Sequence, residues 1–128
     1  MRYGNEMKLT DDTRRGTNFI HAYSPGELRI GESIVRASCI VTADLVQPWT
    51  PQSPDRITIA DLEPVIATAP EIILLGTGET QQFPDTSLLG AILSRGIGLE
   101  VMATGAACRT YNVLVGEDRK VAAALLVR

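Results

Sequence analysis

The chain has 128 residues, of which 45% are hydrophobic and 21% are charged. A chain of this length suits one domain, which hides roughly two-thirds of the surface that its unfolded state exposes, so neither a disulfide nor a metal is needed for a core. The 15 acidic and 12 basic side chains give a net charge of −3, which disfavours binding to nucleic acid or to an acidic membrane surface.

The sequence also argues against a targeting or membrane segment. The longest apolar segment, residues 65–75, is interrupted by polar residues and a proline, whereas a bilayer requires roughly 20 apolar residues. The N-terminus lacks the hydrophobic centre of a secretory signal. We therefore expect a cytoplasmic protein without membrane insertion. In that reducing compartment Cys39 and Cys108 are expected to be free thiols.

The N-terminal third reads as antiparallel strands. Residues 19–23 and 27–30 are extended segments joined by Ser24-Pro25-Gly26, in which Pro-Gly suits the centre of a type II turn. A further segment that ends in Cys39–Thr42 is rich in β-branched residues, and we expect it to extend this hairpin into a meander.

The middle of the chain predicts a connection and then a short helix. Residues 47–54 contain three prolines, which exclude a ladder or a helix, and Trp49 is expected to pin this connection over the core. Two helix starts compete. Thr58 begins a capping box but leaves Pro64 inside the helix, whereas an Asp61 cap places Pro64 in the first turn. We favour Asp61.

The last third alternates strands and helices. Residues 72–75 are a buried strand that leaves the sheet at Gly76-Thr77-Gly78. A helix capped by Asp85 or a neighbouring residue follows, with Gly96 at its left-handed end. Its apolar stripe consists of Leu88, Leu89, Ile92 and Leu93. Then come a strand over residues 99–102, a helix capped by Thr104 that runs to about Val115, and a last strand over residues 121–127, whose direction stays open.

This order predicts an α/β protein with three layers, a mixed central sheet with flanking helices and an N-terminal antiparallel β meander. Residues 1–17 are polar and aperiodic, so we interpret them as a loose arm before a single domain over residues 18–128. Ligands of such sheets gather at the carboxyl ends of the strands. Here those ends are residues 76–78 and 103–105, which we expect to lie side by side.

The first candidate site is the turn Gly76-Thr77-Gly78-Glu79-Thr80. Glycines let backbone N–H groups approach an anion, and a following helix offers positive partial charge. However, Gln81 and Gln82 stand where a Walker loop has glycine and lysine. We therefore favour a structural turn, whose glycines let the strand leave the sheet closely, over an anion site.

The second candidate site is the start of the helix over residues 104–115. Thr104, Gly105 and Cys108 lie in its first turn, where the helix end and the neighbouring Arg109 favour a thiolate. At 100° per residue, one face carries Gly105, Arg109, Asn112 and Gly116, and we expect this face to be open. For Cys108 itself we favour a small, buried, unreactive thiol over a nucleophile.

Catalytic and metal sets are incomplete. A nucleophilic cysteine requires a base, and the only histidine, His21, lies in the front hairpin. One histidine and two distant cysteines do not form a metal site. We expect no cofactor and no metal, and the sequence does not decide whether the protein is an enzyme.

Several blocks together resemble a known family. They are Ile73-Leu-Leu-Gly-Thr-Gly78, Gly96-Ile97, Glu100-Val-Met-Ala-Thr104, Ala106-Ala-Cys-Arg-Thr-Tyr-Asn-Val-Leu114 and residues 119–126. This pattern is similar to the domain of unknown function shared by bacterial and archaeal proteins, the human adipogenesis-associated domain protein and mitochondrial complex I assembly factor 3. The likeness spans roughly residues 18–127.

The resemblance implies a compact three-layer α/β fold and no established activity or cofactor. Its mitochondrial member assists assembly of respiratory complex I, so the resemblance implies a non-enzymatic interaction or assembly-helper module with a protein partner. The alternative is a binder or enzyme for a small anionic ligand, held by the Gly76–Gly78 turn and the Thr104–Arg109 helix start.

Overall fold

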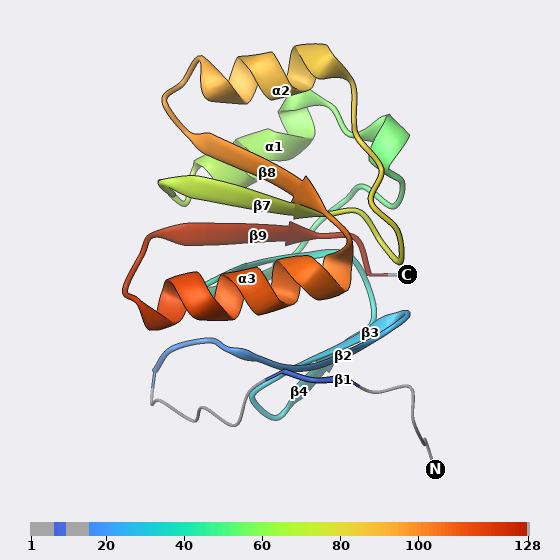
Figure 1. The fold of residues 1–128 in the computed structure, drawn as a ribbon, viewed down its shortest axis with the longest axis vertical. Helices are drawn as coiled ribbons and strands as arrows, with labels where there is room; N and C mark the ends of the chain where they lie inside the picture. The colour runs from blue at the N-terminus through green and yellow to red at the C-terminus, as the bar shows by residue number, and fades with distance from the viewer. Residues whose placement is uncertain (1–6, 10–15, 128) are drawn as a thin grey trace.

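The computed structural model describes residues 7–9 and 16–127 and has the layered α/β architecture that the sequence predicts. Its centre is a five-stranded sheet, with helices α1 and α2 on one face and helix α3 on the other (Figure 1). A four-stranded sheet built from the N-terminal strands covers the far side of α3, so that α3 lies between the two sheets (Figure 1). The three-layer α/β prediction is confirmed, and the N-terminal meander adds a fourth layer.

The N-terminal sheet has the strand order β1-β2-β3-β4 and is antiparallel throughout. Its strands are β1 (Met7–Lys8), β2 (Ile20–Ser24), β3 (Glu27–Ile30) and β4 (Ser33–Val35). Ser24 pairs with Glu27, and Gly26 has a φ of +83°, as the predicted Pro-Gly turn requires. Strand β1 falls inside the predicted loose arm, and residues 1–6 and 10–15 of that arm lie outside the described residues.

The central sheet has the order β6-β5-β9-β7-β8. Its strands are β5 (Cys39–Thr42), β6 (Leu45–Pro48), β7 (Ile72–Gly76), β8 (Gly98–Met102) and β9 (Val121–Leu125). Strands β8 and β9 flank β7 and run parallel to it, while β5 is antiparallel to β9. The direction of the last strand, which the sequence leaves open, is therefore parallel to its neighbour β7.

Two expectations about the middle of the chain are wrong. Cys39–Thr42 does not extend the meander but crosses to the central sheet, where all four of its residues are buried. Gln47 and Pro48 are not loop but the end of β6, a strand at the sheet edge. Proline is tolerated there because an edge strand has one side without ladder partners.

The preferred start of helix α1 (Ile59–Ile66) is also wrong. Thr58 is the N-cap, and it forms a reciprocal capping box with Asp61. Pro64 therefore lies inside the helix. The two satisfied N-terminal donors and the buried Leu62 and Val65 offset the hydrogen bond that Pro64 cannot make. A 3-10 turn, η1 (Pro54–Arg56), precedes this helix.

Helix α2 (Thr86–Leu93) begins at the predicted cap Asp85, whose carboxylate accepts the Ser87 N–H at 2.9 Å. Leu88 and Ile92 are buried as expected, but Leu93 is 58% exposed. Helix α3 (Thr104–Gly116) has Ala103 rather than Thr104 as its N-cap, without a side-chain cap bond. The Thr104 hydroxyl is used elsewhere, as described below.

Two apolar clusters fill the molecule, one on each face of the central sheet. The cluster between the two sheets surrounds α3 and includes Leu28, Val41 and Tyr111. The other lies under α1 and α2 and includes Trp49, Leu62 and Ile92. Alternate residues of β7 face the two clusters, with Leu74 in the first and Ile73 and Leu75 in the second. Strand β7 is thus an interior strand covered on both faces, as its apolar run predicts.

Candidate functional site

The exits of β7 and β8 lie side by side at one edge of the central sheet, as the sequence predicts. Gly76 pairs with Met102 at the ends of the two parallel strands. Past these ends, the Thr77 N–H donates to the Met102 carbonyl at 2.9 Å, and the Thr104 N–H donates to the Gly78 carbonyl at 2.8 Å. The two candidate turns therefore form one connected structure.

Thr104 holds this structure together. Its fully buried hydroxyl accepts the Gly78 N–H at 2.8 Å and donates to the Leu126 carbonyl at 2.7 Å, so it links the chain after β7 to the chain after β9. Gly76 is required for this close approach, because a Cβ there would lie 2.9 Å from the Leu125 side chain and 3.0 Å from the Thr104 Cα.

The Gly76–Gly78 turn directs its polar groups at the protein itself. The N–H groups of Thr77 and Gly78 donate to Met102 and Thr104. The Thr77 hydroxyl donates to the Thr80 carbonyl at 2.6 Å and accepts the Gln82 N–H at 3.0 Å. Both N–H groups are therefore already paired, whereas the exposed Glu79 projects from the turn.

The face of α3 that carries Gly105, Arg109, Asn112 and Gly116 is not open as a whole. Strand β2 covers much of it: a Cβ at Gly105 would lie 3.3 Å from the Tyr23 ring. The Asn112 amide accepts the Ile20 N–H at 2.9 Å and donates to the Ile20 carbonyl at 2.8 Å. Arg109 is exposed at the edge of this contact. Small residues on α3 let a second sheet approach, which helical periodicity alone does not reveal.

Cys108 is fully buried. Burial raises the pKa of its thiol, with a further increase from the proximity of Cys39, and nearby Arg109 offsets only part of this. The favoured interpretation of a buried, unreactive thiol is therefore confirmed, and the helix start does not stabilise a thiolate because desolvation outweighs the neighbouring charge. Both cysteines are free thiols, as predicted.

Tyr23 lies beside this thiol. Burial raises the pKa of its phenol, and the proximity of Cys108 and Glu79 adds to the effect. Its hydroxyl is buried and has no hydrogen-bond partner among the described residues. Tyr23 of β2 thus joins Glu79, Gly105 and Cys108, residues of the two turns that the sequence predicts to lie side by side.

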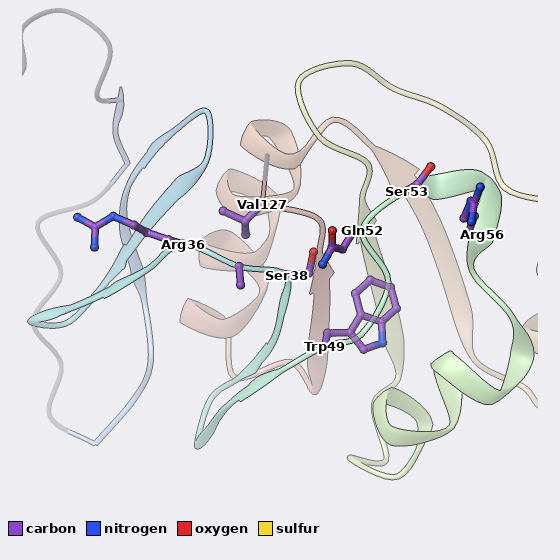
Figure 2. A pocket seen from close by; sticks show the side chains of 8 residues that line it. Arg36, Ser38, Trp49, Gln52, Ser53, Arg56 and Val127 are labelled. Atoms are coloured by element: carbon purple, nitrogen blue, oxygen red, sulfur yellow. The ribbon is translucent and has the colours of Figure 1, made fainter.

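A cavity that the sequence did not reveal lies on the same side of the sheet as these strand exits, beside the end of β9 and the start of β5. It has a volume of about 710 Å³ and is lined by residues 36–38, Trp49, Gln52, Ser53, Arg56 and Val127. Figure 2 shows Arg36 and Arg56 on opposite sides, with Trp49, Ser38 and Gln52 between them. Trp49 is buried as expected, and its indole N–H donates to the Asp61 carbonyl at 2.8 Å.

An apolar groove adjoins this cavity between strands β4 and β6, the edge strands of the two sheets. It has a volume of about 320 Å³ and shares residues 36–38 with the cavity. Ile34 on β4 and Val46 on β6 are 44% and 40% exposed. The one signal for this groove in the sequence is the Leu45-Val46 pair before the prolines, which is too short to define a strand.

Two further properties concern the described residues alone. In residues 7–9 and 16–127, no three histidine, cysteine or carboxylate side chains are grouped so that they can hold a metal ion. Over the same residues, no helix has the length and apolar character needed to cross a bilayer.

The five-stranded mixed sheet, its flanking helices and the antiparallel N-terminal sheet define a layered α/β domain. Residues 20–126 match the family model described as a protein of unknown function (DUF498/DUF598). The chain therefore belongs to this family, as its sequence blocks suggest. In a crystal structure of a protein from Bordetella parapertussis, 32% identical in sequence, the same fold superposes with a TM-score of 0.84, covering 90% of this chain and 99% of that one.

Two curated relatives differ in length. The chain is 34% identical to the 13 kDa major membrane protein of Francisella tularensis, covering 94% of this chain and 99% of that one. It is 33% identical to NADH dehydrogenase (ubiquinone) 1 alpha subcomplex assembly factor 3 of Danio rerio, over 84% of this chain and 63% of that relative. The chain thus spans less than two-thirds of the assembly factor's length.

Proposed function

We propose that this protein is a non-enzymatic interaction module that helps other proteins to assemble. The observation that carries the proposal is the apolar groove between β4 and β6, where two sheet edges and the exposed Val46 lie together. Unpaired strand edges offer N–H and C=O groups to a partner chain, and exposed apolar side chains add affinity. A relative named as an assembly factor, at 33% identity, supports the same conclusion.

We propose a protein partner without naming it. The resemblance to the complex I assembly factor covers 63% of that relative, so respiratory complex I is not carried over as the client. We propose a cytoplasmic location, although a relative is named a membrane protein. Fractionation of cells with an antibody against the native protein tests this, and recovery in the washed membrane fraction alone would contradict it.

Affinity capture with matched variants tests the function. Wild type, Val46→Lys and Val113→Lys are used as baits, because Val113 is 59% exposed on α3 and lies outside the groove. We expect a partner that is retained by wild type and Val113→Lys but reduced at least about fivefold with Val46→Lys. The purified partner must then bind the purified protein with the same order of affinities. Equal recovery by all three baits would show that the groove is not the contact.

A second candidate function is binding of a small anionic ligand at the start of α3. The observation that favours it is the buried Tyr23 hydroxyl, which has no partner among the described residues and lies beside the α3 start. A ligand at 100 times its dissociation constant adds about 2.7 kcal/mol of stability. Phosphate-bearing metabolites should then raise the melting temperature, and Arg109→Ala and Tyr23→Phe should reduce the effect. A flat response across the panel rejects this candidate.

A further inference from the structure

Two open strand edges, those of β4 and β6, flank the groove, and the connection from β4 to β5 forms part of its wall. Among the described strands, β4 pairs only with β3, and β6 pairs only with β5. Residues 36–38 lead directly from β4 into β5 and form part of the groove wall. A strand edge of this kind binds an extended segment through main-chain hydrogen bonds, while alternate side chains of the segment fill pockets beside it.

The register of the two sheets directs apolar side chains into the groove. Val46 pairs with Val41, and Val35 pairs with Leu28. Val41 and Leu28 belong to the cluster between the two sheets. Directly opposed residues of an antiparallel pair share a face, so Val35 and Val46 face the space between the sheets. An apolar side chain of a partner segment therefore has apolar walls on two sides.

The charged side chains that line the groove and the Trp49 cavity are both arginines. Arg36 lines both the groove and the Trp49 cavity, Arg56 lines the cavity, and none of the described residues that line either space is acidic. This contrasts with the net charge of −3 of the chain. Arg36 contacts Glu27 at 3.5 Å, but its side chain stays 68% exposed, and a guanidinium has five N–H donors. The complementary group on a partner is a carboxylate.

We propose that the groove binds an extended segment of a partner protein in which apolar residues alternate and a carboxylate side chain follows. The segment lies beside β6, one apolar side chain fills the groove next to Val46, and the carboxylate pairs with Arg36 where the groove meets the Trp49 cavity. This inference rests on the proposed function and specifies the chemistry of its partner.

Synthetic peptides test the inference on the full chain. One acetylated nonapeptide alternates valine with threonine and ends in two glutamates, and its match ends in two lysines. Each is titrated into isotope-labelled protein, with amide chemical shifts as the measurement. We expect saturable shifts confined to the non-proline residues of 34–38, 45–49 and 52–56. The glutamate peptide should bind at least about threefold more tightly, as an exposed ion pair allows.

Charge reversal provides the control. Arg36→Glu should reverse the preference between the two peptides, whereas Arg95→Glu should leave it unchanged, because Arg95 follows α2 and pairs with Glu63 away from the groove. Folding of both variants is checked in the same spectra. Shifts that do not saturate, equal affinity for both peptides or no reversal with Arg36→Glu would each overturn the inference.

Two further outcomes distinguish a failure of this inference from a failure of the proposed assembly function. If the β6 amides shift with protein concentration before peptide is added, a second copy of the chain occupies the groove and the inference is wrong. If a partner identified by capture binds wild type and Arg36→Glu equally but loses affinity for another surface variant, the assembly function stands and this contact does not.

Discussion

Replacing Thr104 with valine tests whether its hydroxyl joins the strand exits. Thr104→Val keeps the shape of the side chain but removes two buried hydrogen bonds, from the Gly78 N–H and to the Leu126 carbonyl. Each such bond contributes about 1 kcal/mol, and a buried group that loses its partner costs about 1–3 kcal/mol. We expect the free energy of unfolding to fall by about 2–4 kcal/mol.

Urea denaturation followed by far-UV circular dichroism measures this change, provided that the denaturant slope stays constant. The matched control is Thr110→Val on the same helix, whose hydroxyl makes only a 3.6 Å contact with the Met102 sulfur, and for which we expect a change within about 0.5 kcal/mol. Amide hydrogen exchange at Gly78 should accelerate in Thr104→Val alone. A loss below about 1 kcal/mol with unchanged Gly78 exchange would refute the role of Thr104.

Three further predictions concern side chains around the core. Tyr111→Phe should lower the free energy of unfolding by about 1–2 kcal/mol, because the hydroxyl donates to the Asn18 carbonyl at 2.7 Å. Tyr23→Phe should leave the free energy of unfolding unchanged or raise it, since that buried hydroxyl has no described partner. Equal losses for the two variants in urea denaturation would contradict this. Neither cysteine should react with a thiol reagent at pH 8 in the native protein, because burial raises the pKa of Cys39 to about 12 and also raises that of Cys108. Both cysteines should react in urea. Rapid labelling of the native protein would show that a thiol is accessible. The Lys120 N–H and the Arg119 side chain hold the pKa of the Glu71 carboxyl below its ordinary value of 4.5, so its stabilisation is present above that value and is lost as pH falls through the lower, folded-state pKa. The difference in unfolding free energy between wild type and Glu71→Gln should therefore shrink as pH falls from 6 toward 3, and a difference that is constant over this range would exclude that linkage.

The elements best predicted from the sequence are those with local signals. The Pro25-Gly26 turn, the Asp85 cap and the buried run of β7 each depend on residues within a few positions. The side-by-side strand exits also follow, because parallel strands with helical crossovers end at one sheet edge. These features place the two strand exits together, although Thr104 is the first residue of α3 and not its cap.

The features that the sequence did not reveal depend on partners distant in the chain. Cys39–Thr42 is strand-like in either sheet, and only its pairing with β9, more than 80 positions later, decides which. The Gly105–Asn112 face is small and polar, as an open face would be, yet its groups are complementary to β2. The groove is formed by β4 and β6, two short and largely exposed strands in which the alternation of apolar and polar residues is weak.

The Asn112 amide has a consequence for how the protein forms. It presents one acceptor and one donor to the backbone of Ile20, so it acts as a substitute peptide group at the position where the β2 ladder is irregular. This link spans 92 positions. During synthesis the first sheet therefore emerges long before the side chain that completes it, and contacts of such long range form slowly. Protection of the Ile20 amide from exchange would report the moment at which the two ends of the polypeptide become a single cooperative unit.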